Sequence, residues 1–222
     1  MSLLPLIRKP LLCYVTDRLA LGGNSIVAKR ILLETIQRAA EAGVDWIQLR
    51  EKDLSAGELV ALAGAAKDRI GSGSRLLIND RLDVACASGA AGVHLGERSL
   101  PVREGRQFVE ERCGRSEFLM GVSVHSLEAA VEAENGGADY VIFGPVFATP
   151  SKASFGEPQG LAELRAVCGG AKIPVLAIGG ITPQNANECL RAGATGIAAI
   201  RMFQDARDLR QVVSQFRSLT RE

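Results

Sequence analysis

The feature that most constrains the fold is an alternation of short apolar runs with longer amphipathic stretches along the whole chain. The runs are rich in β-branched residues and nearly continuous in hydrophobicity, as in strands buried on both faces of a parallel sheet. The eight runs are Leu11–Thr16, Val44–Leu49, Leu76–Asn79, Gly92–Leu95, Phe118–Val122, Tyr140–Phe143, Val175–Ile178 and Gly196–Ile200. The chain is therefore expected to consist of repeated strand–helix units.

The stretches that follow these runs place apolar residues at helical spacing. The predicted helices are Ile26–Ala42, Ser55–Ile70, Arg81–Ala87, Val102–Cys113, Ser126–Asn135, Leu161–Cys168, Pro183–Ala192 and Ala206–Leu219. Four of the junctions from helix to strand share a glycine followed by a tight entry into the next strand, at Gly43, Gly89, Gly137 and Gly193. These glycines are 46, 48 and 56 residues apart, so each repeat holds two units.

Four double units predict a single-domain (β/α)₈ TIM barrel. The alternative, a doubly wound open sheet, explains the alternation but not the four-fold repeat. The chain of 222 residues is of ordinary size for one barrel, and no linker or change in composition divides it. We expect one domain over residues 1–222, with a short N-terminal extension of about residues 1–10.

Charge and cysteine content narrow the classes of partner. The 26 Lys and Arg residues balance 25 Asp and Glu residues, which gives no overall attraction to nucleic acid or to an anionic membrane. The longest apolar stretches, such as Ile173–Ile178, are too short to cross a bilayer, and the N-terminus lacks the order of a signal peptide. The five cysteines are odd in number and form no C-x-x-C pair, so we expect reduced thiols and a cytoplasmic protein.

In a barrel of this kind the active site lies at the carboxyl ends of the strands. Gln48, Arg50 and Lys52 alternate along an extended segment after the second run, so they can share one face. An amide and two cations suit a polyanion attached to a polar ring. The alternative is a solvated strand end in which Arg50 or Lys52 pairs with Glu51 or Asp53.

Two further strand ends carry candidate ligand-binding groups. Asn79 and Asp80 follow the third run, and the carboxylate could hold Mg²⁺ or could cap the short helix that begins at Arg81. Gly179 and Gly180 follow the seventh run, before Thr182 as N-cap and Pro183 as first helical residue. That loop suits a phosphate bound by backbone N–H groups, although two glycines also make a good tight turn.

The remaining polar residues near strand ends are two histidines, a serine and a lysine. Ser123 and His125 end the fifth run, and His125 could move a proton or could be structural. His94 is expected to point into the barrel as a hydrogen-bonded interior residue. Lys152 lies in a long segment after the sixth run, where a loop could close over a ligand or where the lysine could simply be solvated.

These motifs, taken in order, resemble the thiamine phosphate synthase and TenI family of barrels over nearly the whole chain. The matching stretches, written by residue number, are 14–18 (YVTDR), 48–52 (QLREK), 78–81 (INDR), 92–96 (GVHLG), 121–125 (GVSVH), 144–152 (GPVFATPSK) and 177–181 (AIGGI). The resemblance implies a transferase that joins hydroxymethylpyrimidine diphosphate to thiazole phosphate and releases pyrophosphate. The reaction would be dissociative, so the enzyme mainly stabilises the leaving group and places the thiazole.

The resemblance also assigns roles to residues. Gln48 and Asn79 would contact the pyrimidine, and Asp80 would bind Mg²⁺, the expected cofactor. The catalytic residues expected are Arg50, Lys52, Ser123, Lys152 and His125, of which all but His125 would hold the diphosphate. The thiazole phosphate would be bound by Thr149, Ser151, Gly179, Gly180, Ile200 and Arg201. The expected partners are small-molecule substrates, and a homodimer is compatible with the sequence.

Two positions depart from the synthase pattern. Ser99 stands where synthases carry a second Mg²⁺-binding Asp, so Glu97 or water would have to replace that ligand. Arg201 stands where a small Ser is expected near the thiazole phosphate. TenI-like thiazole tautomerases also lack that Asp and use a histidine at the place of His125. A tautomerase or a non-catalytic regulatory barrel that binds thiazole phosphate are therefore the alternatives, but the intact diphosphate motifs favour the synthase.

Overall fold

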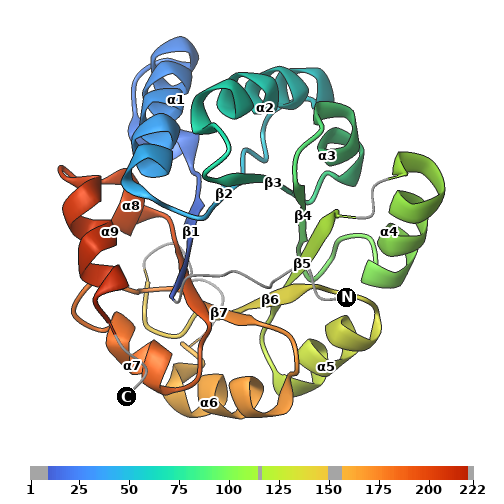
Figure 1. Ribbon diagram of the computed structural model, residues 1–222, viewed down its shortest axis with the longest axis vertical. Helices are drawn as coiled ribbons and strands as arrows, with labels where there is room; N and C mark the ends of the chain where they lie inside the picture. The colour runs from blue at the N-terminus through green and yellow to red at the C-terminus, as the bar shows by residue number, and fades with distance from the viewer. Residues whose placement is uncertain (1–9, 115–116, 150–156, 220–222) are drawn as a thin grey trace.

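The structure, a computed structural model, describes residues 10–114, 117–149 and 157–219. Eight parallel strands pair in chain order, and the last pairs with the first, so the sheet closes into a barrel. The strands are β1 (Leu11–Val15), β2 (Trp46–Leu49), β3 (Arg75–Asn79), β4 (Gly92–Leu95), β5 (Leu119–Val124), β6 (Tyr140–Phe143), β7 (Val175–Ile178) and β8 (Gly196–Ala199). All eight predicted strands are confirmed, and Figure 1 looks along the barrel that they form.

The helices form an outer ring around the barrel (Figure 1). They are α1 (Ser25–Ala42), α2 (Ala56–Ile70), α3 (Leu82–Ser88), α4 (Val102–Phe108), α5 (Leu127–Asn135), α6 (Gly160–Gly170), α7 (Ala186–Arg191), α8 (Arg201–Gln204) and α9 (Leu209–Arg217). A 3₁₀-helix, η1 (Arg18–Leu21), follows β1, and a π-helix, η2 (Val109–Cys113), continues α4. The expected (β/α)₈ barrel is thus the fold, with η1 and α8 as additions that the sequence pattern did not indicate.

The four repeated glycines all adopt a left-handed backbone. Gly43, Gly89, Gly137 and Gly193 have φ values of 94°, 62°, 95° and 106°, where a residue with a side chain would be strained. Gly193 is also crowded, because an added Cβ would lie 2.8 Å from the Cβ of Cys168. The internal repeat therefore marks the points where each helix ends and the chain turns into the next strand.

Two layers of core hold the barrel together. One lies between the strands and the surrounding helices, and the other fills the barrel itself. Inside the barrel the rings of Trp46 and Tyr140 pack with their centroids 4.6 Å apart, among buried aliphatic side chains. Above this apolar filling lie two buried polar side chains, Gln48 and His94, which form the floor of the site at the carboxyl ends of the strands.

The start of α7 differs from the prediction. We expected a helix from Pro183 with Thr182 as its N-cap, but α7 begins at Ala186. The side chain of Asn185 accepts from the backbone N–H of Thr182 at 2.8 Å and donates to the carbonyl of Gly180 at 3.0 Å. These two bonds close the loop over itself, so the two glycines do not lead directly into the first turn of the helix.

The expectation that all five cysteines are reduced is wrong for two of them. Cys86 on α3 and Cys113 on η2 form a disulfide with their Cα atoms 6.2 Å apart. They are 27 residues apart in sequence and come together because consecutive strand–helix units lie side by side around the barrel. Cys13 and Cys189 are buried free thiols.

The search for a membrane span gives a plain result. Among the helices of the described segments, none combines the length and the apolar character needed to cross a membrane.

Candidate active site

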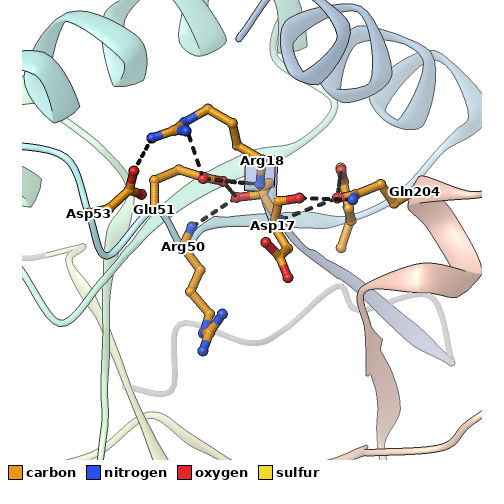
Figure 2. A network of polar contacts seen from close by, with 8 residues as sticks. Asp17, Arg18, Arg50, Glu51, Asp53 and Gln204 are labelled. Carbon is orange, nitrogen blue, oxygen red and sulfur yellow. Dashed lines mark hydrogen bonds and ion pairs between the residues drawn. The ribbon is translucent and has the colours of Figure 1, made fainter. Parts of the chain in front are cut away.

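A buried arginine, Arg18, forms ion pairs with the acidic residues that neighbour Arg50 and Lys52 in the sequence. The Arg18 guanidinium pairs with Asp53 at 2.5 Å and lies 3.7 Å from Glu51, and the Arg18 backbone N–H donates to both oxygens of the Glu51 carboxylate (Figure 2). The interpretation in which Arg50 or Lys52 pairs with these acids is therefore wrong. Within the described parts of the chain, neither cation has a hydrogen bond or ion pair from its charged group.

The backbone that carries Arg50 is held by a buried hydroxyl. Thr16, at the end of β1, donates through Oγ1 to Glu51 Oε1 at 2.6 Å and accepts the backbone N–H of Arg50 at 2.9 Å. Burial raises the pKa of the Glu51 carboxyl, against the lowering effect of the Thr16 and Arg18 hydrogen bonds and the Arg18 charge. In Figure 2 the Arg50 side chain points away from the carboxylates of Glu51 and Asp53.

Thr16→Val should test whether this hydroxyl fixes the end of β2. Valine keeps the shape of threonine but leaves the Arg50 N–H without its acceptor and removes one of the two donors to Glu51 Oε1. This change should cost about 2 kcal/mol of unfolding free energy. Chemical denaturation measures that loss, and Thr16→Ser is the matched control because it retains the hydroxyl. Equal stability of the valine and serine variants would contradict this role.

A second connection runs from α8 to β1. The Gln204 side chain accepts from the Tyr14 hydroxyl at 3.0 Å and from the Asp17 backbone N–H at 3.2 Å, and it donates to the Asp17 carbonyl at 2.9 Å. Figure 2 shows this contact beside the Arg18 cluster. The segments after β8 and β1 are thereby tied together on one side of the barrel mouth.

Three side chains, on β2, on β3 and directly after β3, form a hydrogen-bonded chain with a fixed direction. Asn79 donates through Nδ2 to Asp80 Oδ2 at 3.0 Å, and Gln48 donates through Nε2 to Asn79 Oδ1 at 2.8 Å. Because an ionised carboxylate can only accept, the orientation of both amides follows from Asp80. Gln48 Oε1 is left buried with no partner among the described residues, so it is ready to accept from a donor on a ligand.

The Asp80 carboxylate is built into the site and does not cap α3. Its Oδ1 accepts the Gly96 N–H at 2.9 Å and the Ser99 hydroxyl, whereas the N-cap of α3 is Arg81 without a side-chain cap. Asp80 is also the one non-glycine residue in the described segments with positive φ, 61°. The capping interpretation is wrong, because the carboxylate is bound by Gly96 and Ser99 of the next strand–helix unit.

The surroundings of Asp80 stabilise the ionised form of its carboxyl group. Burial pushes its pKa upward, but hydrogen bonds from Ser99 and Gly96 and the charge of Lys52 outweigh that effect, so the pKa lies below its ordinary value. No group of three or more His, Cys, Asp or Glu residues within the described segments could surround a metal ion. A single ionised carboxylate at the mouth is a donor that Mg²⁺ accepts when water and ligand oxygens complete its shell.

The two histidines have different environments. His94 is buried, with Nε2 2.9 Å from Ser123 Oγ and Nδ1 3.2 Å from the Tyr140 hydroxyl, and burial lowers its pKa to about 4 against a small opposing effect of Asp80. The expectation of a hydrogen-bonded interior residue is confirmed. His125 is partly exposed, with Nδ1 on the Gly144 carbonyl and Nε2 3.9 Å from Glu97. Glu97 thus faces His125, while Ser99 contacts Asp80.

The glycine pair after β7 lies tightly against the segment after β6. Gly179 and Gly180 have φ values of 98° and 63°, and an added Cβ would approach Pro145 and the Ala148 carbonyl to 2.5 Å in each case. The Phe147 N–H donates to the Gly179 carbonyl at 3.0 Å. This packing agrees with the tight-turn interpretation and brings the two loops together, as a shared anion site would require.

The other predicted thiazole-phosphate residues lie at the ends of these loops or outside the described segments. Thr149 is the last described residue before residues 150–156, which lie outside the described segments. Ile200 is the N-cap of α8, and Arg201 is the exposed first residue of that helix. Ser151 and Lys152 lie outside the described residues. The sequence reasoning missed the hydrogen bonds and ion pairs of Thr16, Arg18 and Glu51 that hold the end of β2, because each is a tertiary contact.

Eight parallel strands closed into a barrel, with Arg50, Lys52 and an ionised Asp80 at their carboxyl ends, define a TIM-barrel enzyme whose mouth suits an anionic small molecule. The family model described as thiamine monophosphate synthase matches residues 14–203, and the chain belongs to this family.

Individual relatives agree with that assignment. A thiamine-phosphate synthase of Moorella thermoacetica is 40% identical over 212 residues, covering 92% of this chain and 96% of its own. One from Methanoculleus marisnigri is 46% identical over 163 residues, covering 73% of this chain and 75% of its own. A solved thiamine phosphate pyrophosphorylase from Pyrococcus furiosus is 34% identical with a TM-score of 0.79, and the match covers 96% of each chain.

Proposed function

We propose that this protein is a thiamine-phosphate synthase, which joins hydroxymethylpyrimidine diphosphate to thiazole phosphate and releases pyrophosphate. The observation that carries the proposal is the Gln48–Asn79–Asp80 chain beside Arg50 and Lys52. It offers a buried acceptor for the amino group of a pyrimidine next to two cations for a diphosphate. The family membership and the synthase relatives support the same conclusion.

The chemistry breaks the bond between the pyrimidine methylene carbon and the diphosphate oxygen. That bonding pair leaves with the diphosphate, and the thiazole nitrogen then gives its lone pair to the carbon. Gln48 Oε1 would orient the pyrimidine, while Arg50, Lys52 and Ser123 would bind the leaving group, where negative charge grows. Lys152 joins this group on its sequence motif alone, because it lies outside the described residues.

Mg²⁺ is the cofactor proposed for this reaction, with Asp80 as the protein carboxylate that would hold it. When bound, the ion neutralises charge on the diphosphate. Ser99 would hold the Asp80 carboxylate in place through its hydroxyl, which already donates to Asp80 Oδ1. The thiazole phosphate would bind between the loops that follow β6, β7 and β8, with Thr149, Ser151, Gly179, Gly180, Ile200 and Arg201 as the proposed contacts.

The test is to mix the purified protein with both substrates and Mg²⁺ and to measure both products. Thiamine phosphate and pyrophosphate should appear in equal amounts. Thiazole tautomerisation without either product would favour the tautomerase, and binding without turnover would favour a regulatory barrel.

His125→Ala should retain most synthase activity on the aromatic thiazole, since the attacking thiazole nitrogen needs no deprotonation. A tautomerase would instead lose its acid–base group, and its activity would fall strongly.

A further inference from the structure

A line of three polar side chains runs from the apolar interior of the barrel to its mouth, and only its outer end, Ser123, belongs to the residues proposed above to bind substrate. It starts at the Tyr140 hydroxyl, passes through the imidazole of His94 and ends at the Ser123 hydroxyl. Tyr140 is fully buried and His94 is 2% exposed, whereas Ser123 lies near the carboxyl end of β5 and is partly exposed. The line therefore connects the core to the proposed diphosphate site.

The direction of the proton at Tyr140 follows from its surroundings. Within the described segments, the hydroxyl has a single hydrogen-bond partner, His94 Nδ1. The Tyr140 ring packs against the Trp46 ring, and its hydroxyl lies against the Cα of Gly121, where an added Cβ would clash with the hydroxyl oxygen. Neither of these neighbours offers a lone pair. If Nδ1 carried a proton, the tyrosine oxygen would accept it and its own buried O–H would have no acceptor, which is unfavourable. Tyr140 therefore donates to Nδ1.

The tautomer of His94 then follows from the chemistry of the ring. Both partners of the imidazole are neutral hydroxyls and the ring is buried, so it is neutral and carries one proton. With Nδ1 accepting, that proton is on Nε2, which donates to Ser123 Oγ at 2.9 Å. The Ser123 oxygen consequently accepts a hydrogen bond from His94, and the Ser123 hydroxyl proton remains available to donate to another partner.

We propose that Tyr140 and His94 are positioning residues that fix the Ser123 hydroxyl as a hydrogen-bond donor toward an anion at the barrel mouth. Ser123 alone could point its proton at His94 or at the ligand. The fixed imidazole tautomer removes the first choice, so the donor is oriented before the anion binds. The identity of the anion as the leaving diphosphate rests on the proposed synthase function; the tautomer does not.

The first experiment reads the tautomer directly and needs no substrate. The chain has two histidines, so His125→Gln leaves His94 as the one imidazole in the spectrum. Long-range ¹H–¹⁵N correlation at neutral pH distinguishes the protonated ring nitrogen from the bare one. We expect Nε2 to be protonated in this background and both tautomers to be populated after Tyr140→Phe is added. A protonated Nδ1 with Tyr140 present would overturn the proposal.

The second experiment is a double-mutant cycle on kcat. Ser123→Ala should lower kcat about a hundredfold as a lost transition-state donor, and Tyr140→Phe should lower it about tenfold because the hydroxyl is then oriented only part of the time. If Tyr140 acts through Ser123, adding Tyr140→Phe to Ser123→Ala should have no further effect. The same tenfold loss in both backgrounds would overturn the positioning role.

Tyr14→Phe is the matched control for this cycle. Tyr14 is also a fully buried tyrosine of the barrel, and its hydroxyl donates to Gln204 on the opposite side of β1 from the His94 line. The Tyr14→Phe substitution removes the same hydroxyl group and one buried hydrogen bond, so it should lower stability without a kcat effect that depends on Ser123.

A protein without synthase activity would contradict the proposed function, while the nitrogen spectrum would still decide the tautomer of His94.

Discussion

Arg50→Ala should lower kcat about a hundredfold, equivalent to about 3 kcal/mol of transition-state stabilisation. The acids that could have neutralised Arg50 are held by Arg18, so the guanidinium is available to a ligand. A contact with the leaving diphosphate strengthens as charge develops, so kcat should fall by more than KM rises. Steady-state kinetics at saturating Mg²⁺ measures both constants.

Two further variants make this prediction specific. Arg50→Lys retains the charge but not the planar pair of donors, so its activity should lie between those of the parent protein and the alanine variant. Arg30→Ala removes an exposed arginine on α1 that pairs with Glu34 at 2.8 Å, and it should leave kcat unchanged. Unfolding free energy should change by less than about 0.5 kcal/mol in each case. Near-normal kcat in Arg50→Ala would exclude Arg50 from the site.

Asp80→Asn should lower activity by about two orders of magnitude and raise the Mg²⁺ concentration needed for half-maximal activity. The substitution removes the charge while retaining the shape, and asparagine tolerates the positive φ of 61° found at this position. The backbone should therefore remain in place, and the loss reports on the carboxylate and on the orientation of the Asn79 and Gln48 amides that it sets. The measurement is activity as a function of Mg²⁺ concentration. The same curve for the parent protein and for this variant would contradict the proposed metal site.

Ser99→Asp tests the same site by adding a charge. The Ser99 hydroxyl already contacts Asp80 Oδ1, so a carboxylate there would face a like charge, and the melting temperature without Mg²⁺ should fall. Mg²⁺ should restore stability, and half-maximal activity should need about tenfold less of it. Ser99→Ala is the control for the lost hydroxyl, and Glu97→Gln should leave the Mg²⁺ dependence unchanged because Glu97 faces His125. An unchanged melting temperature and Mg²⁺ curve for Ser99→Asp would show that position 99 does not face the metal.

Much of the barrel could be predicted from local patterns. A strand covered on both faces is apolar throughout, which is why Gly92–Leu95, Tyr140–Phe143 and Val175–Ile178 were predicted with the bounds that the structure has. The repeated glycines were equally readable, since a left-handed turn at Gly43 or Gly193 requires the absence of a side chain. Because the carboxyl ends of all strands of such a barrel meet on one face, the location of the site followed as well.

Local patterns failed where two partners lie far apart in the chain. By its position before a short helix, Asp80 suited a capping role at least as well as metal binding, and only its contacts with Gly96 and Ser99 on the next strand–helix unit decide against capping. The start of α7 moved to Ala186 because Asn185 folds back on its own loop. The disulfide between Cys86 and Cys113 was missed because nothing in their spacing shows that α3 and η2 are neighbours.

The sequence by itself determined the closed barrel, the end at which its polar residues gather and the types of charge found there. Tertiary structure alone decided which of those charges are available to a ligand. Arg18 pairs with Glu51 and Asp53, Thr16 holds the backbone of Arg50, and the Tyr140 hydroxyl lies against Nδ1 of His94. The physical reason is that periodicity records which face of each element is buried, whereas pairing of charges and protons depends on distances between elements that no local pattern encodes.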